Sequence, residues 1–75
     1  MAEITIRSEL NAVVWKIQVA VGATVLEGDT MIVLESMKME IPVAAPRDAG
    51  VKAILVSEGA QVVEGQALAV LETGN

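Results

Sequence analysis

The chain of 75 residues has room for one domain with a modest core, and it carries a net charge of −5 with neither cysteine nor histidine. Disulfides and thiolate metal sites are therefore excluded, and an independent hydrolase or metalloenzyme is disfavoured because the commonest general base and metal ligand is missing. The acidic balance disfavours nucleic-acid binding, and no apolar run approaches the ~20 residues of a membrane span. We expect a cytoplasmic protein, with no nucleic-acid or membrane partner, in which residues 1–75 form a single domain.

The first predicted elements in chain order have the pattern of half-buried strands. Apolar and polar residues alternate over residues 4–7 and again over residues 15–19. Valine and isoleucine dominate the apolar residues, and β-branched side chains favour strands. A helix behind Ser8 also fits the apolar residues at 10, 13, 14 and 17, but the internal repeat described below aligns this segment with a strand. We therefore predict a strand here.

Glycines and prolines divide the rest of the chain into short pieces. Pro42 and Pro46 break any helix after residue 40. Four glycines stand where turns require positive φ, namely Gly22, Gly28, Gly59 and Gly65. Short strands with frequent turns predict an all-β fold, either a small flattened barrel or two packed sheets.

The chain also repeats its own pattern at an offset of 37 residues. Residues 14–28 align with 51–65, and residues 33–36 align with 70–73. The repeat predicts two similar halves related by a pseudo-twofold axis. We expect the stability of the domain to depend on four aliphatic side chains that match across the repeat, which are Ile17, Val19, Ile54 and Val56.

The most distinctive segment lies midway between the two copies of the repeat, and it reads Glu35-Ser36-Met37-Lys38-Met39-Glu40. It places one of only three lysines between two flexible thioethers. The offset of the repeat maps Lys38 onto Asn75, the last residue. The Met-Lys-Met turn should therefore project from the end of the molecule opposite the termini.

This segment, with Ala45-Pro46 and the paired Val-Gly-Ala and Glu-Gly turns, resembles the biotinyl/lipoyl attachment domain family over about residues 4–72. The resemblance implies a barrel-sandwich hybrid, a flattened barrel of two four-stranded sheets, with the modified lysine on an exposed hairpin. In biotin carriers methionines flank the lysine on both sides, whereas in lipoyl domains it usually follows aspartate and precedes alanine. Met37-Lys38-Met39 is similar to the biotin branch.

The resemblance implies a carrier with no active site of its own. A biotin protein ligase would activate the carboxylate of biotin as an acyl-adenylate, and the Lys38 amine would attack it to form an amide. The attached biotin would then move a carboxyl group between biotin carboxylase and carboxyltransferase centres. The chain would thus be the carrier domain or subunit of a biotin-dependent carboxylase, and the cofactor does the chemistry.

The residues around Lys38 are assigned to recognition by the ligase. Met37 and Met39 offer adaptable apolar contacts, although methionine also fills irregular gaps in cores. Glu35 and Glu40 either guide docking to a basic partner or simply raise solubility. Ser36 stands where biotin carriers usually have alanine.

Three alternatives stay open. The first is lipoylation of the same Lys38 by a lipoate ligase, instead of or in addition to biotinylation, since the fold serves both cofactors and Ser36 departs from the biotin pattern. The second is an interaction module whose lysine is never modified. The third, an autonomous enzyme, is the weakest because histidine and cysteine are missing.

Overall fold

The computed structural model of the protein describes residues 2–74, and this part of the chain forms strands and turns without a helix. The strands are β1 (Ala2–Arg7), β2 (Ala12–Ile17), β3 (Thr24–Val25), β4 (Thr30–Ser36), β5 (Met39–Ala44), β6 (Ala49–Ile54), β7 (Gln61–Val62) and β8 (Ala67–Thr73). The segment whose apolar spacing also fitted a helix forms β2, so the strand prediction is right. In the same range of residues there is no helix with the length and apolar character needed to cross a membrane.

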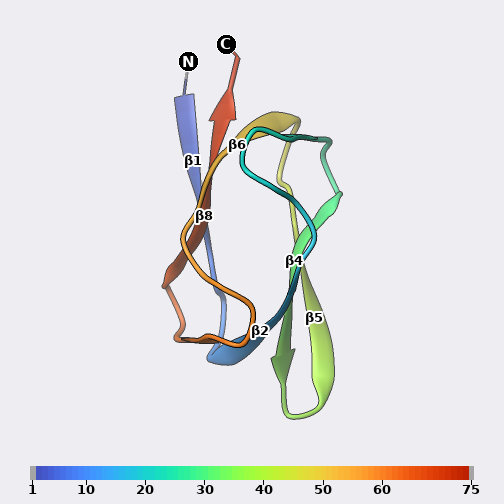
Figure 1. Ribbon diagram of the computed structural model, residues 1–75, viewed down its shortest axis with the longest axis vertical. Helices are drawn as coiled ribbons and strands as arrows, with labels where there is room; N and C mark the ends of the chain where they lie inside the picture. Colours follow the sequence, from blue (N-terminus) through green and yellow to red (C-terminus); the bar gives the residue numbers. More distant parts are fainter. Residues whose placement is uncertain (1, 75) are drawn as a thin grey trace.

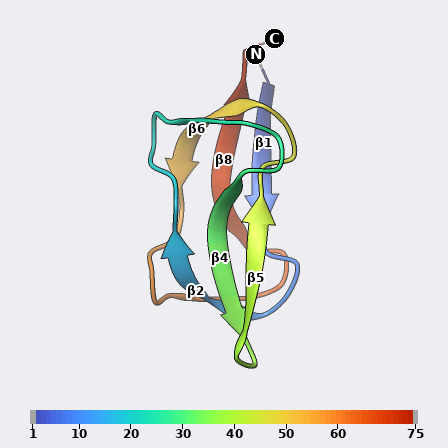
Figure 2. The same ribbon diagram turned by 90° about the vertical axis from the view of Figure 1, so that its right-hand side faces the viewer.

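The strands form two antiparallel sheets of four, with the orders β1-β8-β6-β3 and β5-β4-β2-β7. Figures 1 and 2 show the two sheets lying against each other along the long axis of an elongated molecule, whose extents are 38 × 18 × 17 Å. Chain segments cross between the sheets at both ends. The predicted all-β barrel-sandwich architecture of two four-stranded sheets is confirmed.

The internal repeat of the sequence is also a repeat of the structure. Shifting the bounds of β1, β2, β3 and β4 by 37 positions gives the bounds of β5, β6, β7 and β8. The same shift exchanges the two sheets, strand for strand. The two halves are therefore related by a pseudo-twofold axis, and each half contributes two strands to each sheet.

The pseudo-symmetry extends to the turns. The Glu27 amide donates a hydrogen bond to Asp48 Oδ1 (2.8 Å), and the equivalent Glu64 amide donates to Asn11 Oδ1 (2.8 Å). Aspartate and asparagine both place an acceptor oxygen one carbon beyond Cβ, so either residue holds the same turn. The two halves thus keep one hydrogen-bonding pattern with different residues.

The irregularities of the sheets repeat as well. The register between β2 and β4 skips Trp15, and the register between β6 and β8 skips the equivalent residue, Lys52. A bulge of this kind bends a strand and increases its local twist. Each sheet is therefore bent at the matching position in its long strands.

The core lies between the sheets and comes mainly from β4 and β8. Met31 and Leu68, which are equivalent in the repeat, are both fully buried, and so are Leu34 and Leu71. The largest side chains with almost no exposed surface are Met31, Ile32, Leu34, Leu68, Leu71, Val14 and Val25. Each half therefore contributes a similar set of side chains to one shared core.

The four matched aliphatic residues on which we expect the stability of the domain to depend lie around the core and are not at its centre. Ile17, Val19, Ile54 and Val56 are only partly buried and pack against the margin of the core. They lie at the ends of β2 and β6 and in the segments that follow, where the chain leaves the sheet. These residues were chosen because they match across the repeat, but a match does not indicate how deeply a side chain is buried.

One glycine position gives a test of the turn geometry. Gly28 has φ of +90°, and a Cβ added there would meet no atom within 4 Å. Gly28→Ala should therefore cost about 1–2 kcal/mol through the backbone conformation alone. Gly74 has equal space without a left-handed φ, so Gly74→Ala should change the free energy of unfolding by less than about 0.5 kcal/mol. If urea denaturation showed the same decrease in the free energy of unfolding for Gly28→Ala and Gly74→Ala, the assigned turn geometry would be contradicted.

Candidate attachment site

The segment around Lys38 forms a tight hairpin between β4 and β5. Ser36 pairs with Met39 across the ladder, and Glu35 pairs with Glu40, so only Met37 and Lys38 make the turn. Both turn residues have positive φ, 53° at Met37 and 66° at Lys38. A two-residue turn with positive φ at both positions is of type I′, whose twist matches that of the flanking strands.

The residues in this turn conflict with its local preference. Type I′ turns favour Asn-Gly, because other residues are strained at positive φ by about 1–2 kcal/mol each. The strain persists because β4 and β5 pair along their whole length and fix the turn from both sides. The outcome is a rigid turn that presents the side chains of Met37 and Lys38.

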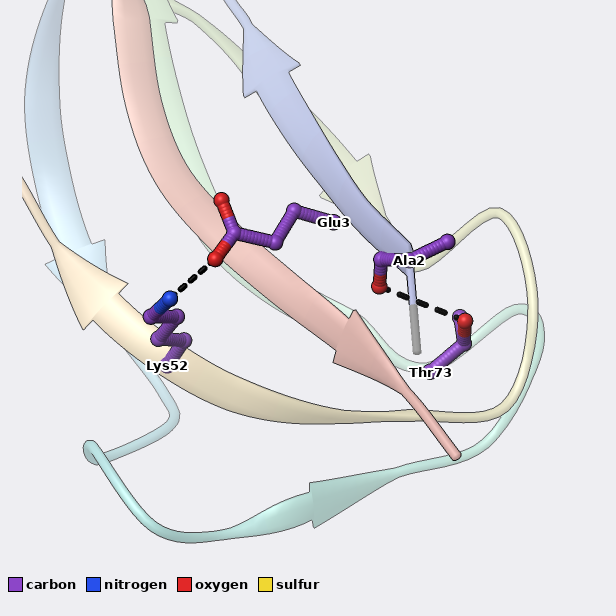
Figure 3. Close-up of polar contacts among 4 residues, drawn as sticks. All are labelled: Ala2, Glu3, Lys52 and Thr73. Carbon is purple, nitrogen blue, oxygen red and sulfur yellow. Dashed lines mark hydrogen bonds and ion pairs between the residues drawn. The ribbon is translucent and has the colours of Figure 1, made fainter. Parts of the chain in front are cut away.

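The hairpin projects from one end of the molecule, as the repeat predicts. Figures 1 and 2 show its tip at the end opposite the start of β1 and the end of β8. Ala2 pairs with Thr73 at that other end, in the place equivalent to the pairing of Met39 with Ser36. Figure 3 shows this pair, in which Thr73 Oγ1 donates to the Ala2 carbonyl (3.3 Å). Asn75, the equivalent of Lys38, lies outside the described residues.

The methionines beside Lys38 do not fill the core. Met37 is 92% exposed and Met39 is 67% exposed. Lys38, Glu35 and Glu40 are exposed as well, and Ser36 is half-buried. The alternative that the two methionines are packing residues is therefore wrong. The turn brings all six residues of the predicted segment to one tip.

The other two lysines have partners. Lys52 of β6 forms an ion pair with Glu3 of β1 (Figure 3). The hydrogen bond to Glu3, together with the charge of that carboxylate, raises the pKa of the Lys52 amine, which makes the neutral nucleophilic form scarcer. Lys16 Nζ lies 5.8 Å from the centroid of the Trp15 ring, within reach of a cation–π contact. Of the ion pairs within residues 2–74, none involves Lys38.

Two hollows lie on the surface near the sheets. One, of about 400 Å³, is beside the hairpin, and its lining includes Met37, Ser36 and Glu35 as well as residues of β2 and β7. The other, of about 310 Å³, separates the edge strands β1 and β5. No group of three His, Cys, Asp or Glu side chains within the described range is arranged to hold a metal ion. The chemical feature that stands out is a rigidly held, solvent-exposed amine.

A comparison with known protein families identifies the family to which the chain belongs. The family model described as "Biotin-requiring enzyme", which covers biotin and lipoyl domains, matches residues 5–71. The chain belongs to this family. The predicted family is thereby confirmed, and biotin is confirmed as the cofactor of the family.

Curated relatives of this biotin/lipoyl domain are similar to it over 57% to 60% of its length. The Biotinylated protein TB7.3 homolog of Mycolicibacterium smegmatis is 53% identical over 45 residues, which make up 60% of this chain and 62% of that protein. The Biotin/lipoyl attachment protein of Bacillus subtilis is 40% identical over 43 residues, 57% of this chain and 59% of that protein. The matches thus span less than two thirds of either relative.

A solved structure matches the domain even more completely. It is the structure of a single-chain, multi-domain long-chain acyl-CoA carboxylase, with a TM-score of 0.91 and 32% sequence identity. The match covers 97% of this biotin/lipoyl domain and 7% of the much longer carboxylase chain. The same fold therefore occurs as a small part of a large multi-domain carboxylase.

One feature of the domain's site was not predicted. Positive φ was expected at four glycines, and Met37 and Lys38 have it as well. The signal that would have indicated this is the two-residue gap between β4 and β5, since hairpins with such short connections use turns with positive φ. Strand ends are difficult to place from sequence, so the gap was not visible.

Proposed function

We propose that Lys38 is the covalent attachment point for biotin and that the domain is a carrier of this cofactor. The single observation that carries the proposal is the position of Lys38 on a strained two-residue turn at the tip of the molecule. A side chain held there reaches solvent in every direction away from the sheets. The two other lysines lie on strands and are engaged with neighbouring side chains.

The domain contributes a nucleophile and no other reactive group. In the attachment step the Lys38 amine attacks the activated carboxyl carbon of biotin, an amide bond forms, and the bond to the activating group breaks. The amine also loses a proton, and no histidine is available in the sequence to accept it. We therefore assign proton removal to the ligase, and we regard the domain as a substrate of a biotin protein ligase.

We assign recognition by the ligase to the residues that share the tip with Lys38. Met37 and Met39 are large apolar side chains that are mostly exposed, so their surfaces are available to a partner. Glu35 and Glu40 lie opposite each other across the hairpin and place two negative charges next to the lysine. Such a pair favours approach of a basic surface, mainly through the rate of association. Ser36 is half-buried and pairs with Met39, one step nearer the turn.

The partners that we propose are a biotin carboxylase centre and a carboxyltransferase centre. Support comes from the structural match to one part of a multi-domain acyl-CoA carboxylase. Biotin supplies a ureido nitrogen that accepts and releases a carboxyl group. The domain holds that group on a long tether at the end opposite the chain termini, which raises its local concentration at both centres. Its role is that of a carrier, without catalysis of its own. The single domain of residues 1–75 and the cytoplasmic location stay predictions.

The experiment that tests the carrier role uses labelled bicarbonate. The purified protein is loaded by a biotin protein ligase and then incubated with a biotin carboxylase, ATP and ¹⁴C-bicarbonate. We expect the label to appear on the wild-type protein and to be absent from a sample never exposed to the ligase. Loaded protein that takes up no label from the carboxylase would contradict the carrier role while leaving attachment intact.

A second candidate function is lipoylation of the same lysine. The observation that favours it is the similarity to a protein named for both cofactors, the Biotin/lipoyl attachment protein of Bacillus subtilis. Both attachments need only an exposed amine on a rigid turn. Parallel incubation with a lipoate ligase distinguishes biotin alone from attachment of either cofactor. If neither ligase modified the protein, an interaction module would remain.

A further inference from the structure

We propose that Met37 and Met39 are a site of reversible oxidation, and that their oxidation controls whether Lys38 can be modified. This inference rests on the proposed function of Lys38. It starts from the exposure of the two thioethers, which are 92% and 67% accessible and stand on either side of the acceptor lysine. The tip that carries them extends past the neighbouring loops in Figure 2.

The fold separates these two methionines sharply from a third. Met31 lies on the same strand as Glu35, β4, but its side chain is fully buried between the sheets. An oxidant in solution therefore reaches the sulfur atoms of Met37 and Met39 while the domain stays folded, whereas Met31 is shielded. Within residues 2–74, oxidation of methionine is thus confined to the tip.

The chemistry needs a hydroperoxide, of which hydrogen peroxide is the simplest. The sulfur lone pair attacks one peroxide oxygen, the O–O bond breaks, and an S–O bond forms. The thioether loses two electrons and becomes a sulfoxide, and the peroxide is reduced to water. Methionine sulfoxide reductases reverse the step with a dithiol as the reductant: the dithiol is oxidised to a disulfide, the S–O bond breaks, and the oxygen leaves as water. Separate enzymes act on the two sulfoxide epimers.

Oxidation changes what the tip offers to a partner. A sulfoxide is strongly polar, so a ligase surface that binds an apolar Met37 or Met39 would have to bury a polar group without a matching hydrogen-bond donor. We expect kcat/KM for attachment to fall about ten- to hundredfold, which is the usual range for such burial. The stability of the domain should not change, because both side chains are exposed and the turn is fixed by backbone pairing.

The experiment oxidises the carrier alone. The unmodified protein is treated with hydrogen peroxide, the peroxide is removed with catalase, and tandem mass spectrometry locates each added oxygen. The rate of biotin attachment by a biotin protein ligase is then measured. We expect sulfoxides at Met37 and Met39 and none at Met31, a ten- to hundredfold lower kcat/KM, and an unchanged melting temperature. Treatment with both methionine sulfoxide reductases and a dithiol reductant should restore the rate of attachment.

The matched control is the double variant Met37→Leu/Met39→Leu, which keeps the apolar character and cannot form a sulfoxide. For each protein the attachment rate of the oxidised sample is divided by that of its own untreated sample. For the double variant this ratio should be close to one. Trp15 is 44% exposed and can be oxidised as well. Because the double variant keeps Trp15, any effect of its oxidation on the attachment rate would also appear in the variant.

Three results would overturn the inference. The first is an unchanged rate of biotin attachment to the oxidised wild-type protein. The second is an equal fall in the attachment rate of the oxidised double variant. The third is a fall in the wild-type rate that the reductases do not reverse. The untreated wild-type sample tests the proposed function separately. If the untreated protein accepts no biotin, attachment itself fails, whereas equal rates before and after oxidation contradict only the switch.

Discussion

Replacement of Lys38 by arginine is expected to abolish covalent attachment of biotin. A guanidinium group is held at the same place on the same turn and keeps the positive charge, but it stays protonated and does not attack an activated carboxyl group. The change therefore removes the chemistry and preserves the shape and charge of the tip. We expect biotin incorporation, measured by intact-mass spectrometry after incubation with a biotin protein ligase, to fall from complete to undetectable.

Lys16→Arg and Lys52→Arg are the matched controls. Both lysines lie on strands of the sheets, and each keeps its contact as arginine, with Trp15 in one case and Glu3 in the other. Both variants should accept biotin at the wild-type rate. Incorporation that survives in Lys38→Arg and is lost in either control would show that the acceptor has been misplaced.

The second large effect is expected in the core, where Leu34→Ala should destabilise the domain by about 2–5 kcal/mol. Leu34 is fully buried on β4, and its equivalent in the repeat, Leu71, is fully buried on β8. Leu71→Ala should therefore cost a similar amount, because the cavity opens in an equivalent position of the shared core. For a chain of this size such a loss is a large fraction of the total stability.

Urea denaturation measures these effects, since small single domains usually unfold in one cooperative transition. Ile17→Ala should cost less than Leu34→Ala because Ile17 is only partly buried. Lys38→Ala should change the free energy of unfolding by less than about 0.5 kcal/mol, because its side chain is in solvent. A Lys38→Ala variant that unfolds, or a Leu34→Ala variant as stable as the wild type, would contradict this description of the fold.

The repeat was the part of the fold that could best be predicted from the sequence. The shift of 37 residues in the sequence corresponds to an exchange of the two sheets in the structure. The turn contacts of Asp48 and Asn11 are related by the same shift. Repeats are visible because turn glycines and strand patterns recur at a fixed distance. The projection of Lys38 away from the chain termini followed from the same shift.

The depth of individual side chains was less predictable. Stability was expected to depend on Ile17 and Ile54, which are only partly buried, whereas Leu34 and Leu71 are fully buried. Alternation along a strand shows which side chains share a face, but not how far along the strand the opposing sheet covers that face. This coverage depends on how two segments distant in sequence pack together, and no local pattern contains it.

The family of the chain was predictable from the segment around Lys38, but the conformation of the turn was not. The sequence around Lys38 indicated a modified lysine, yet Met37 and Lys38 adopt positive φ against their own preference. Pairing between β4 and β5 imposes this conformation, so it is a property of the folded sheet. The exposure of Met37 likewise depends on its place in the two-residue turn, which the sequence alone does not define.

The most direct test of the account is to locate the attached group on the wild-type protein. The protein is incubated with a biotin protein ligase, biotin and ATP, digested, and analysed by tandem mass spectrometry. We expect one biotinyl group per chain, on Nζ of Lys38. A biotinyl group on Lys16 or Lys52, or a protein that the ligase leaves unmodified, would contradict it.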